Sequence, residues 1–117
     1  MPGKKVTFDT VRKMALALPG VEESTSYGTP SFKLNGQLLT CTAINKAAEP
    51  NTLMVRISTE DRDELIEADP NVYYTADHYA PYPCVLVRLS RVNPDALRDL
   101  LLMGWRFMSS KKKSRRR

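Results

Sequence analysis

Positively charged side chains offer the clearest chemistry in this chain of 117 residues, and they are concentrated at its C-terminus. Six of the 18 basic residues fall within the last seven positions, as Lys111, Lys112, Lys113, Arg115, Arg116 and Arg117. A cluster of this kind binds nucleic-acid phosphates by releasing their counterions, which gives an affinity that falls with salt and recognises no sequence. The same charges suit an anionic lipid surface or an acidic protein, and a terminus that only aids solubility is the alternative.

The rest of the chain is close to neutral. Removing those six cations from the total of 18 leaves 12 basic residues against 13 acidic ones over residues 1–110, so the net charge of +5 belongs to the tail. Strand alternation nevertheless places five polar residues on the outward face of the predicted sheet, namely Lys33, Thr40, Thr42, Arg56 and Arg88, and Arg106 lies in the last predicted helix. We expect Lys33, Arg56, Arg88 and Arg106 to follow a phosphate backbone; the alternative is a solvated face whose arginines pair with carboxylates.

The single histidine, His78, lies between Asp77 and Tyr79 in a proline-rich loop. A neutral imidazole there could act as a base, a metal ligand or a proton switch; the alternative is a structural side chain that ties the loop by hydrogen bonds. One histidine without a second one or a CxxC motif predicts no metal site.

Cys41 and Cys84 fall in apolar strand patterns typical of small buried thiols, and they imply no disulfide.

Aromatic residues near the ends of predicted elements form the last candidate site. Tyr79 in the loop and Trp105 in the last helix would flank a cleft if these two segments meet. Aromatic side chains in such positions more commonly cover the edge of the core, so Trp105 is also a candidate for closing one side of the domain.

No catalytic motif accompanies these residues. The five glycines, at positions 3, 20, 28, 36 and 104, form neither a GxGxxG motif nor a P-loop. Glu22 and Glu23 are adjacent, so in a strand their carboxylates point to opposite faces and cannot act as a pair. We therefore expect a protein that is not an enzyme and that carries no metal and no cofactor.

In the first half of the chain, residues typical of helix ends and turns predict the elements that position these groups. Thr7 predicts the start of a helix over residues 8–18, which Pro19 and Gly20 end, and a short strand follows over 21–27. The pair Asn35-Gly36 between alternating segments predicts a β-hairpin with a type I′ turn over residues 31–44.

Two strand-then-helix units follow in the second half. The segments 54–58 and 86–90 share one pattern, and each precedes a predicted helix: residues 60–68 capped by Thr59, and residues 94 to about 108 capped by Asn93. Residues 72–75 form a possible short strand, and residues 76–83 form a loop.

These elements predict an α+β domain of two layers, with an antiparallel sheet of about five strands covered on one side by about three helices. Residues 1–110 form this single domain, and residues 111–117 form a basic tail that is disordered or, at most, a fraying extension of the last helix. The chain shows neither a long apolar span nor a secretory signal, which predicts a cytoplasmic protein.

Several segments together resemble the MmcQ/YjbR family of small, mostly bacterial proteins. They are Ala17–Glu23, Gly28–Gln37, His78–Pro83, Val85–Leu89 and Gly104–Arg106. The resemblance covers nearly all of residues 7–108 and implies a compact fold similar to CyaY-like and secretion-chaperone-like domains, described as a double wing and often labelled DNA-binding.

The sequence and the resemblance together predict a non-enzymatic protein that binds DNA mainly through electrostatic contacts with the backbone. The alternative is a protein-binding module that resembles secretion chaperones, has no affinity for nucleic acid and uses an apolar patch near Trp105 and the loop of residues 76–83.

Overall fold

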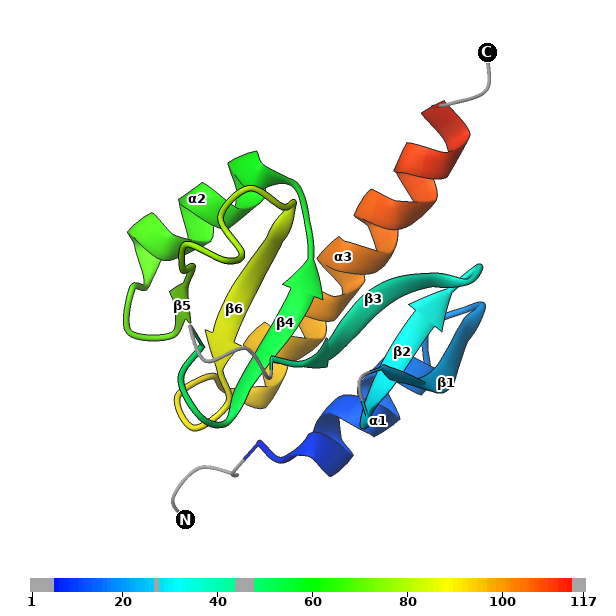
Figure 1. The fold of residues 1–117 in the computed structure, drawn as a ribbon, viewed down its shortest axis with the longest axis horizontal. Coiled ribbons are helices and arrows are strands. Elements are labelled where there is room, and N and C mark those ends of the chain that lie inside the picture. The colour runs from blue at the N-terminus through cyan, green and yellow to red at the C-terminus, as the bar shows by residue number, and fades with distance from the viewer. Residues whose placement is uncertain (1–5, 27, 44–47, 115–117) are drawn as a thin grey trace.

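Six antiparallel strands form one sheet in the computed structural model of the chain, which describes residues 6–26, 28–43 and 48–114 (Figure 1). The strands are Val21–Ser26 (β1), Thr29–Leu34 (β2), Gln37–Thr42 (β3), Thr52–Arg56 (β4), Tyr73–Tyr74 (β5) and Cys84–Arg88 (β6). Their order across the sheet is β1-β2-β3-β4-β6-β5. The count is six instead of about five because the two-residue strand β5 pairs with β6 at one edge.

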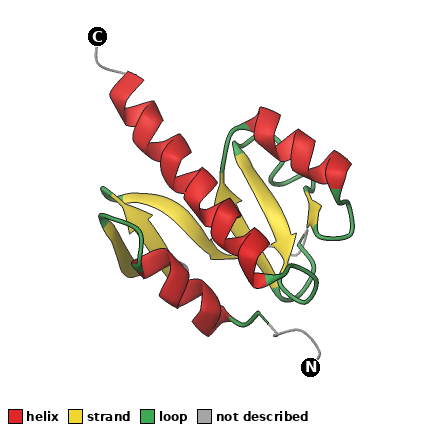
Figure 2. Cartoon of the chain, turned by 180° about the vertical axis from the view of Figure 1, so that it is seen from behind, coloured by secondary structure: helices red, strands yellow, loops and turns green. Residues whose placement is uncertain are grey.

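Three helices lie on one face of this sheet (Figure 2). They are Phe8–Leu16 (α1), Thr59–Ala68 (α2) and Pro94–Ser114 (α3). Helix α1 covers β1 and β2, α3 covers β3 and β4, and α2 covers β5 and β6. The predicted α+β domain of two layers is therefore confirmed.

The turn between β2 and β3 has the predicted geometry. Asn35 and Gly36 have φ angles of 55° and 82°, the two positive values that a type I′ turn requires. The turn joins two antiparallel strands, so the hairpin prediction is confirmed.

Helix starts follow the capping signals with one exception. Asn93 caps α3, because its Oδ1 accepts a hydrogen bond of 2.8 Å from the backbone N–H of Ala96. Ser58 caps α2 in place of the predicted Thr59, since its Oγ accepts from the N–H of Asp61 at 3.1 Å. Helix α1 ends at Leu16, two residues before the predicted end.

Helix α3 is longer than predicted. It continues to Ser114, so the backbone of residues 111–114 follows the second alternative predicted for this segment, an extension of the last helix. Lysine is a good helix former, and cations near a helix C-terminus interact favourably with the helix dipole. Residues 115–117 lie outside the described part of the chain.

The main core lies between the sheet and the helices. Its largest fully buried side chains include Phe32, Leu39, Leu53, Ile57, Leu97, Leu100 and Leu101. Alternate residues of each strand contribute side chains to this core from the sheet, and one apolar stripe of α3 contributes side chains from the helical layer.

The opposite face of the sheet carries none of the three helices but holds a second, smaller apolar cluster. Met54, Cys84 and Leu86 are buried there, and Ala76 and Tyr79 from the loop of residues 76–83 pack against them. Strands β4 and β6 carry apolar residues at nearly every position, as expected of strands buried on both faces.

Candidate nucleic-acid interface

The structure places the two predicted arginines of the outward face at opposite ends of a strand pair. Arg56 ends β4 and is the register partner of Cys84, whereas Arg88 ends β6 and is the partner of Thr52. Four residues of strand separate the two positions, which is roughly 13 Å at 3.3 Å per residue. Arg56 and Arg88 therefore lie at opposite ends of the outward face.

Arg88 is occupied by partners within the chain. Its Nε and Nη2 each donate to Glu49 at 2.8 Å, and its Nη1 donates to the carbonyl oxygens of Pro70 and Asn71 at 3.1 and 3.2 Å. These hydrogen bonds use four of the five guanidinium N–H groups. The group also stacks on Tyr74, 4.2 Å from the ring centroid. Arg88 therefore has a structural role, in line with the alternative that the arginines of this face pair with carboxylates.

Tyr74 extends this arrangement to the start of β4. Its Oη accepts a hydrogen bond of 2.8 Å from the backbone N–H of Glu49 and lies 2.8 Å from Oγ1 of Thr52. The hydrogen bond from Arg88 lowers the pKa of the Glu49 carboxyl, and the same bond raises the pKa of Arg88. We call Glu49, Tyr74 and Arg88 the Arg88 network.

A β-bulge removes both threonines from the outward face. Phe32 pairs with Thr40 and Lys33 pairs with Leu38, which leaves Leu39 as an extra residue in β3. Thr40 is therefore fully buried beside Val55 of the main core, and its Oγ1 donates to the carbonyl oxygen of Met54 at 2.7 Å. The bulge likewise sets Thr42 opposite Leu53, so the predicted outward position of both threonines is wrong.

Lys33 and Arg56 remain together at one end of the sheet. Lys33 is the register partner of Leu38, and the Leu38 carbonyl oxygen accepts a hydrogen bond of 3.5 Å from Nη1 of Arg56. Both side chains are half-buried. The Arg56 Nε is buried and, within the part of the chain that the structure describes, has no hydrogen-bond partner.

Helix α3 crosses the sheet at this same end. A Cβ added to Gly104 would lie 2.6 Å from the carbonyl oxygen of Arg56, so the helix axis passes directly over the end of β4. Beyond that crossing, α3 projects past the sheet (Figure 1). Arg106 is exposed on it, and the helical backbone carries residues 111–113 further out.

The predicted basic residues therefore converge in part. Lys33 and Arg56 on the outward face, Arg106 on α3 and the helical backbone of Lys111–Lys113 lie at one end of the molecule, which we call the basic end. The side chains of Lys111, Lys112 and Lys113, and residues Arg115, Arg116 and Arg117, lie outside the described part of the chain.

The loop of residues 76–83 is held by an arginine that sequence reasoning missed. Arg62 of α2 donates from Nη1 to the carbonyl oxygens of Ala80 and Tyr82, at 2.9 and 3.4 Å. His78 is exposed, and its ring packs edge-on against Tyr79 with centroids 5.0 Å apart. Arg62 thus holds the loop by hydrogen bonds, which is the role predicted for His78. The sequence feature that could have indicated this role is that Arg62 is the single basic residue in a helix rich in acidic residues.

Tyr79 and Trp105 lie on opposite faces of the sheet, so the predicted cleft between them does not form. Tyr79 packs on the outward cluster, whereas Trp105 packs against the main core. The indole Nε1 donates a hydrogen bond of 2.8 Å to the carbonyl oxygen of Pro19. Trp105 therefore closes one side of the domain, and it forms no shared apolar patch with the loop.

Replacing Trp105 with phenylalanine tests this role. The substitution keeps an aromatic ring but removes the donor to Pro19, and we expect a loss of about 1 kcal/mol in the free energy of unfolding. Urea denaturation followed by circular dichroism measures it. Tyr82→Phe is the matched control, because Tyr82 is 57% exposed and its change should have no measurable effect. An unaltered stability of Trp105→Phe would contradict the assignment.

The cysteines carry no reactive thiolate. Cys84 is buried and Cys41 is half-buried, and both are free thiols. Burial, with a smaller effect from Cys84, raises the pKa of Cys41 to about 11, so this thiol is protonated at neutral pH.

Across residues 6–26, 28–43 and 48–114, no three or more His, Cys, Asp or Glu side chains are placed to hold a metal ion. No helix in the same ranges is long and apolar enough to cross a membrane.

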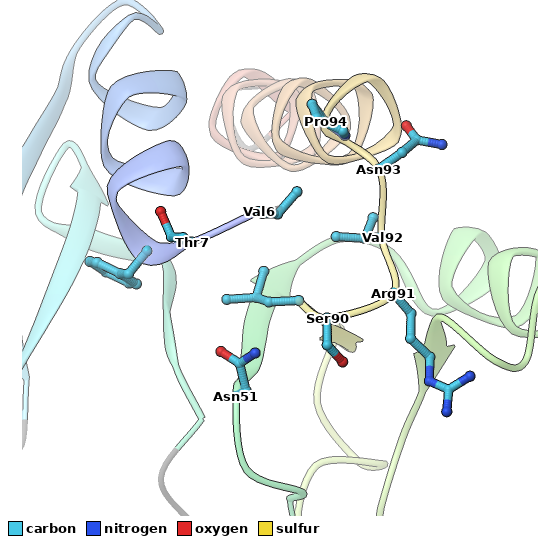
Figure 3. A pocket seen from close by; sticks show the side chains of 10 residues that line it. Val6, Thr7, Asn51, Ser90, Arg91, Val92, Asn93 and Pro94 are labelled. Atoms are coloured by element: carbon cyan, nitrogen blue, oxygen red, sulfur yellow. The ribbon is translucent and has the colours of Figure 1, made fainter. Parts of the chain in front are cut away.

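A cavity of about 580 Å³ lies at the other end of α3, where this helix and α1 begin side by side (Figure 3). Its floor includes the buried residues Val6 and Val92, and its rim includes Thr7 and Asn51. Arg91 is the charged residue of the lining, and its side chain points away from Val6 and Val92 in Figure 3. This cavity is therefore not part of the basic end.

Comparison with known proteins agrees with this fold. The chain is similar to the crystal structure of protein DR2400 from Deinococcus radiodurans, a DUF419 domain, with a TM-score of 0.75 and 23% sequence identity over 92% of this chain and 82% of that one. At this identity the likeness concerns the fold.

Curated relatives match a shorter segment. The uncharacterized proteins Rv2570 of Mycobacterium tuberculosis and Mb2600 of Mycobacterium bovis are each 38% identical over 58 residues, which is 49% of this chain. The match spans 45% of the length of each relative, less than half. The family model named YjbR matches residues 16–107, which include β1 to β6 and the crossing of α3 over the sheet. The chain belongs to the YjbR family.

Proposed function

We propose that this protein binds nucleic acid without catalysis, through electrostatic contacts between the basic end and the phosphate backbone. The observation that carries the proposal is the path of α3, which continues to Ser114 and takes a run of three lysines away from the body. A projecting helix can approach a phosphate backbone without moving the domain. The nearly neutral body then adds little long-range repulsion.

Backbone contacts fit the described side chains better than base stacking. Single-strand binders stack bases on exposed aromatic rings, and Trp105, the neighbour of Arg106 in α3, is instead packed against the core and bonded to Pro19. Binding is therefore weakly specific in sequence, with Kd values of roughly 10⁻⁴ to 10⁻⁶ M at physiological salt.

The absence of catalysis is part of the same proposal. His78 is exposed in a surface loop, the thiol of Cys41 is protonated at neutral pH, and Arg88 is engaged by its network. Binding to a phosphate backbone requires none of these groups.

Fluorescence anisotropy of a labelled DNA duplex tests the proposal. We expect Lys111→Gln/Lys112→Gln/Lys113→Gln to weaken binding and to reduce the slope of log K against log salt by about 3, because each lost phosphate contact removes about 0.9 from the slope. An unchanged slope would overturn the role of α3.

A pair of single substitutions separates position from net charge. Arg106 and Arg91 are both exposed arginines near α3, but Arg106 lies at the basic end and Arg91 precedes the helix start. Arg106→Gln is expected to reduce the salt slope by about 1, and Arg91→Gln is expected to leave it unchanged. Equal losses in both variants would show that net charge, and no defined surface, drives binding.

A further inference from the structure

An apolar groove of about 350 Å³ runs between α1 and α3 on the surface of the helical layer. Its lining consists of Lys13, Met14, Ala17, Leu18, Arg98, Leu101 and Leu102. The two helices run in the same direction, because Phe8 and Pro94 at their starts line one cavity and the hydrogen bond from Trp105 to Pro19 joins them further along. The groove therefore has one end toward the helix starts and one end toward the Trp105–Pro19 contact.

Charge and apolar surface are separated along this groove. Lys13 and Arg98 stand on opposite walls, about one turn before Leu18 and Leu102. The cations thus lie toward the helix starts, and the apolar lining continues toward the Trp105–Pro19 contact. Met14 adds a flexible thioether that adapts to aliphatic ligands.

We propose that this groove binds a medium-chain aliphatic carboxylate, with the carboxylate between Lys13 and Arg98 and the hydrocarbon chain along the leucines. The polarity gradient matches a ligand with one anionic head and one apolar tail. The volume lies near the lower end of the range of roughly 300 to 1,000 Å³ for ligand pockets, which favours a single short chain.

The cations are available to such a ligand. Arg98 pairs with Asp95 at 3.1 Å, but the two side chains are 61% and 91% exposed, and surface pairs of this kind exchange partners at little cost. Lys13 is exposed on α1. A carboxylate that bridges the two walls would meet a cation on each side.

Trp105 is the single tryptophan of the chain and lies near the apolar end, so its fluorescence reports binding. We expect saturable titrations with octanoate, decanoate and dodecanoate below their micelle concentrations. Affinity should rise with chain length, by up to roughly fourfold for each methylene that the groove buries. Decyltrimethylammonium, with the same chain length as decanoate and a cationic head, should bind at least tenfold more weakly.

Two variants locate the site. Ala17→Phe fills the groove from α1 and should abolish decanoate binding, whereas Ala17→Ser should retain it; thermal unfolding confirms that both variants are folded. Lys13→Gln/Arg98→Gln should remove the preference for decanoate over decyltrimethylammonium. These titrations contain no DNA and leave the basic end intact, so their outcome is independent of nucleic-acid binding.

Three titration results would overturn the proposal. They are equal affinities for the anionic and cationic ligands, decanoate binding that survives Ala17→Phe, and the absence of saturable binding by dodecanoate. A dimer in sedimentation experiments that Ala17→Phe dissociates would also overturn it, because the groove would then hold a second copy of the chain.

Discussion

Replacing Gly104 with valine is expected to lower the free energy of unfolding by about 3 kcal/mol, because α3 crosses β4 with no room for a side chain. An added Cβ would lie 2.6 Å from the carbonyl oxygen of Arg56 and 3.1 and 3.2 Å from methyl groups of Leu39 and Val55. The nearest of these atoms belongs to the backbone of a strand in the middle of the sheet, so it cannot rotate away. The helix itself would have to move.

Intrinsic helix propensity acts in the opposite direction, because replacing a glycine inside a helix normally stabilises the helix. A net loss of stability would therefore show that the steric clash outweighs the gain in propensity. Glycine is less favourable than other ordinary residues inside a helix, by up to about 1 kcal/mol relative to alanine. We expect the order of stability Gly, Ala, Val at position 104. Asp99→Val is the matched control on the exposed side of α3 and should change stability by less than about 1 kcal/mol. Urea unfolding of the three variants decides the matter, and a Gly104→Val protein as stable as the parent would contradict the close crossing.

Replacing Arg88 with alanine is expected to cost about 2 to 3 kcal/mol, because the substitution removes hydrogen bonds that join three separate segments. Arg88 bonds Glu49 before β4 and the carbonyl oxygens of Pro70 and Asn71 before β5. Arg88→Lys should recover only part of the loss, since an ammonium group cannot reproduce the bidentate contact with Glu49. Arg106→Ala, an exposed arginine on α3 outside this network, serves as the control.

The pKa of Glu49 provides an independent check on the same network. The hydrogen bond from Arg88 lowers that pKa below its ordinary value of 4.5, and Arg88→Ala should raise it again. A carboxyl with a lowered folded-state pKa stabilises the fold above the unfolded-state pKa, and this contribution is lost as the pH falls through the folded-state pKa. The stability difference between the parent and Arg88→Ala should therefore be largest near neutral pH and should shrink below pH 4.5. A difference that is independent of pH would contradict the pairing.

The structural features that the sequence predicts correctly depend on residues that are close together along the chain. The turn at Asn35-Gly36 depends on two backbone angles, and the cap at Asn93 depends on a side chain and the helix that follows it. The resemblance to the MmcQ/YjbR family rests on short local segments, among them the turns within residues 17–23 and 28–37 and the strand at residues 85–89. It is confirmed by the family match over residues 16–107.

Contacts between distant segments account for what the sequence does not predict. Arg88 meets Glu49 across 39 positions, so an alternation rule can assign its face but not its partners. A single bulge at Leu39 moves Thr40 from the outward face into the main core. The candidate cleft between Tyr79 and Trp105 fails for a similar reason, because the sheet separates them.

The basic end depends both on local signals and on contacts between distant segments. The charges of residues 111–113 are evident in the sequence, but a segment without apolar residues has the composition of a disordered tail. Helix α3 nevertheless continues through these residues, since a preceding helix that is already packed removes the cost of nucleation. Their position relative to Arg56 depends on the close crossing at Gly104.

The most direct test of the account is the salt dependence of DNA binding by the full chain and by a variant in which six cations are replaced by glutamine, at Lys111, Lys112, Lys113, Arg115, Arg116 and Arg117. We expect the parent to bind a duplex at low salt, with a slope of log K against log salt steeper than that of the variant by up to about 5, since six contacts each contribute about 0.9. Equal slopes, or no binding by the parent at low salt, would contradict electrostatic binding through these cations.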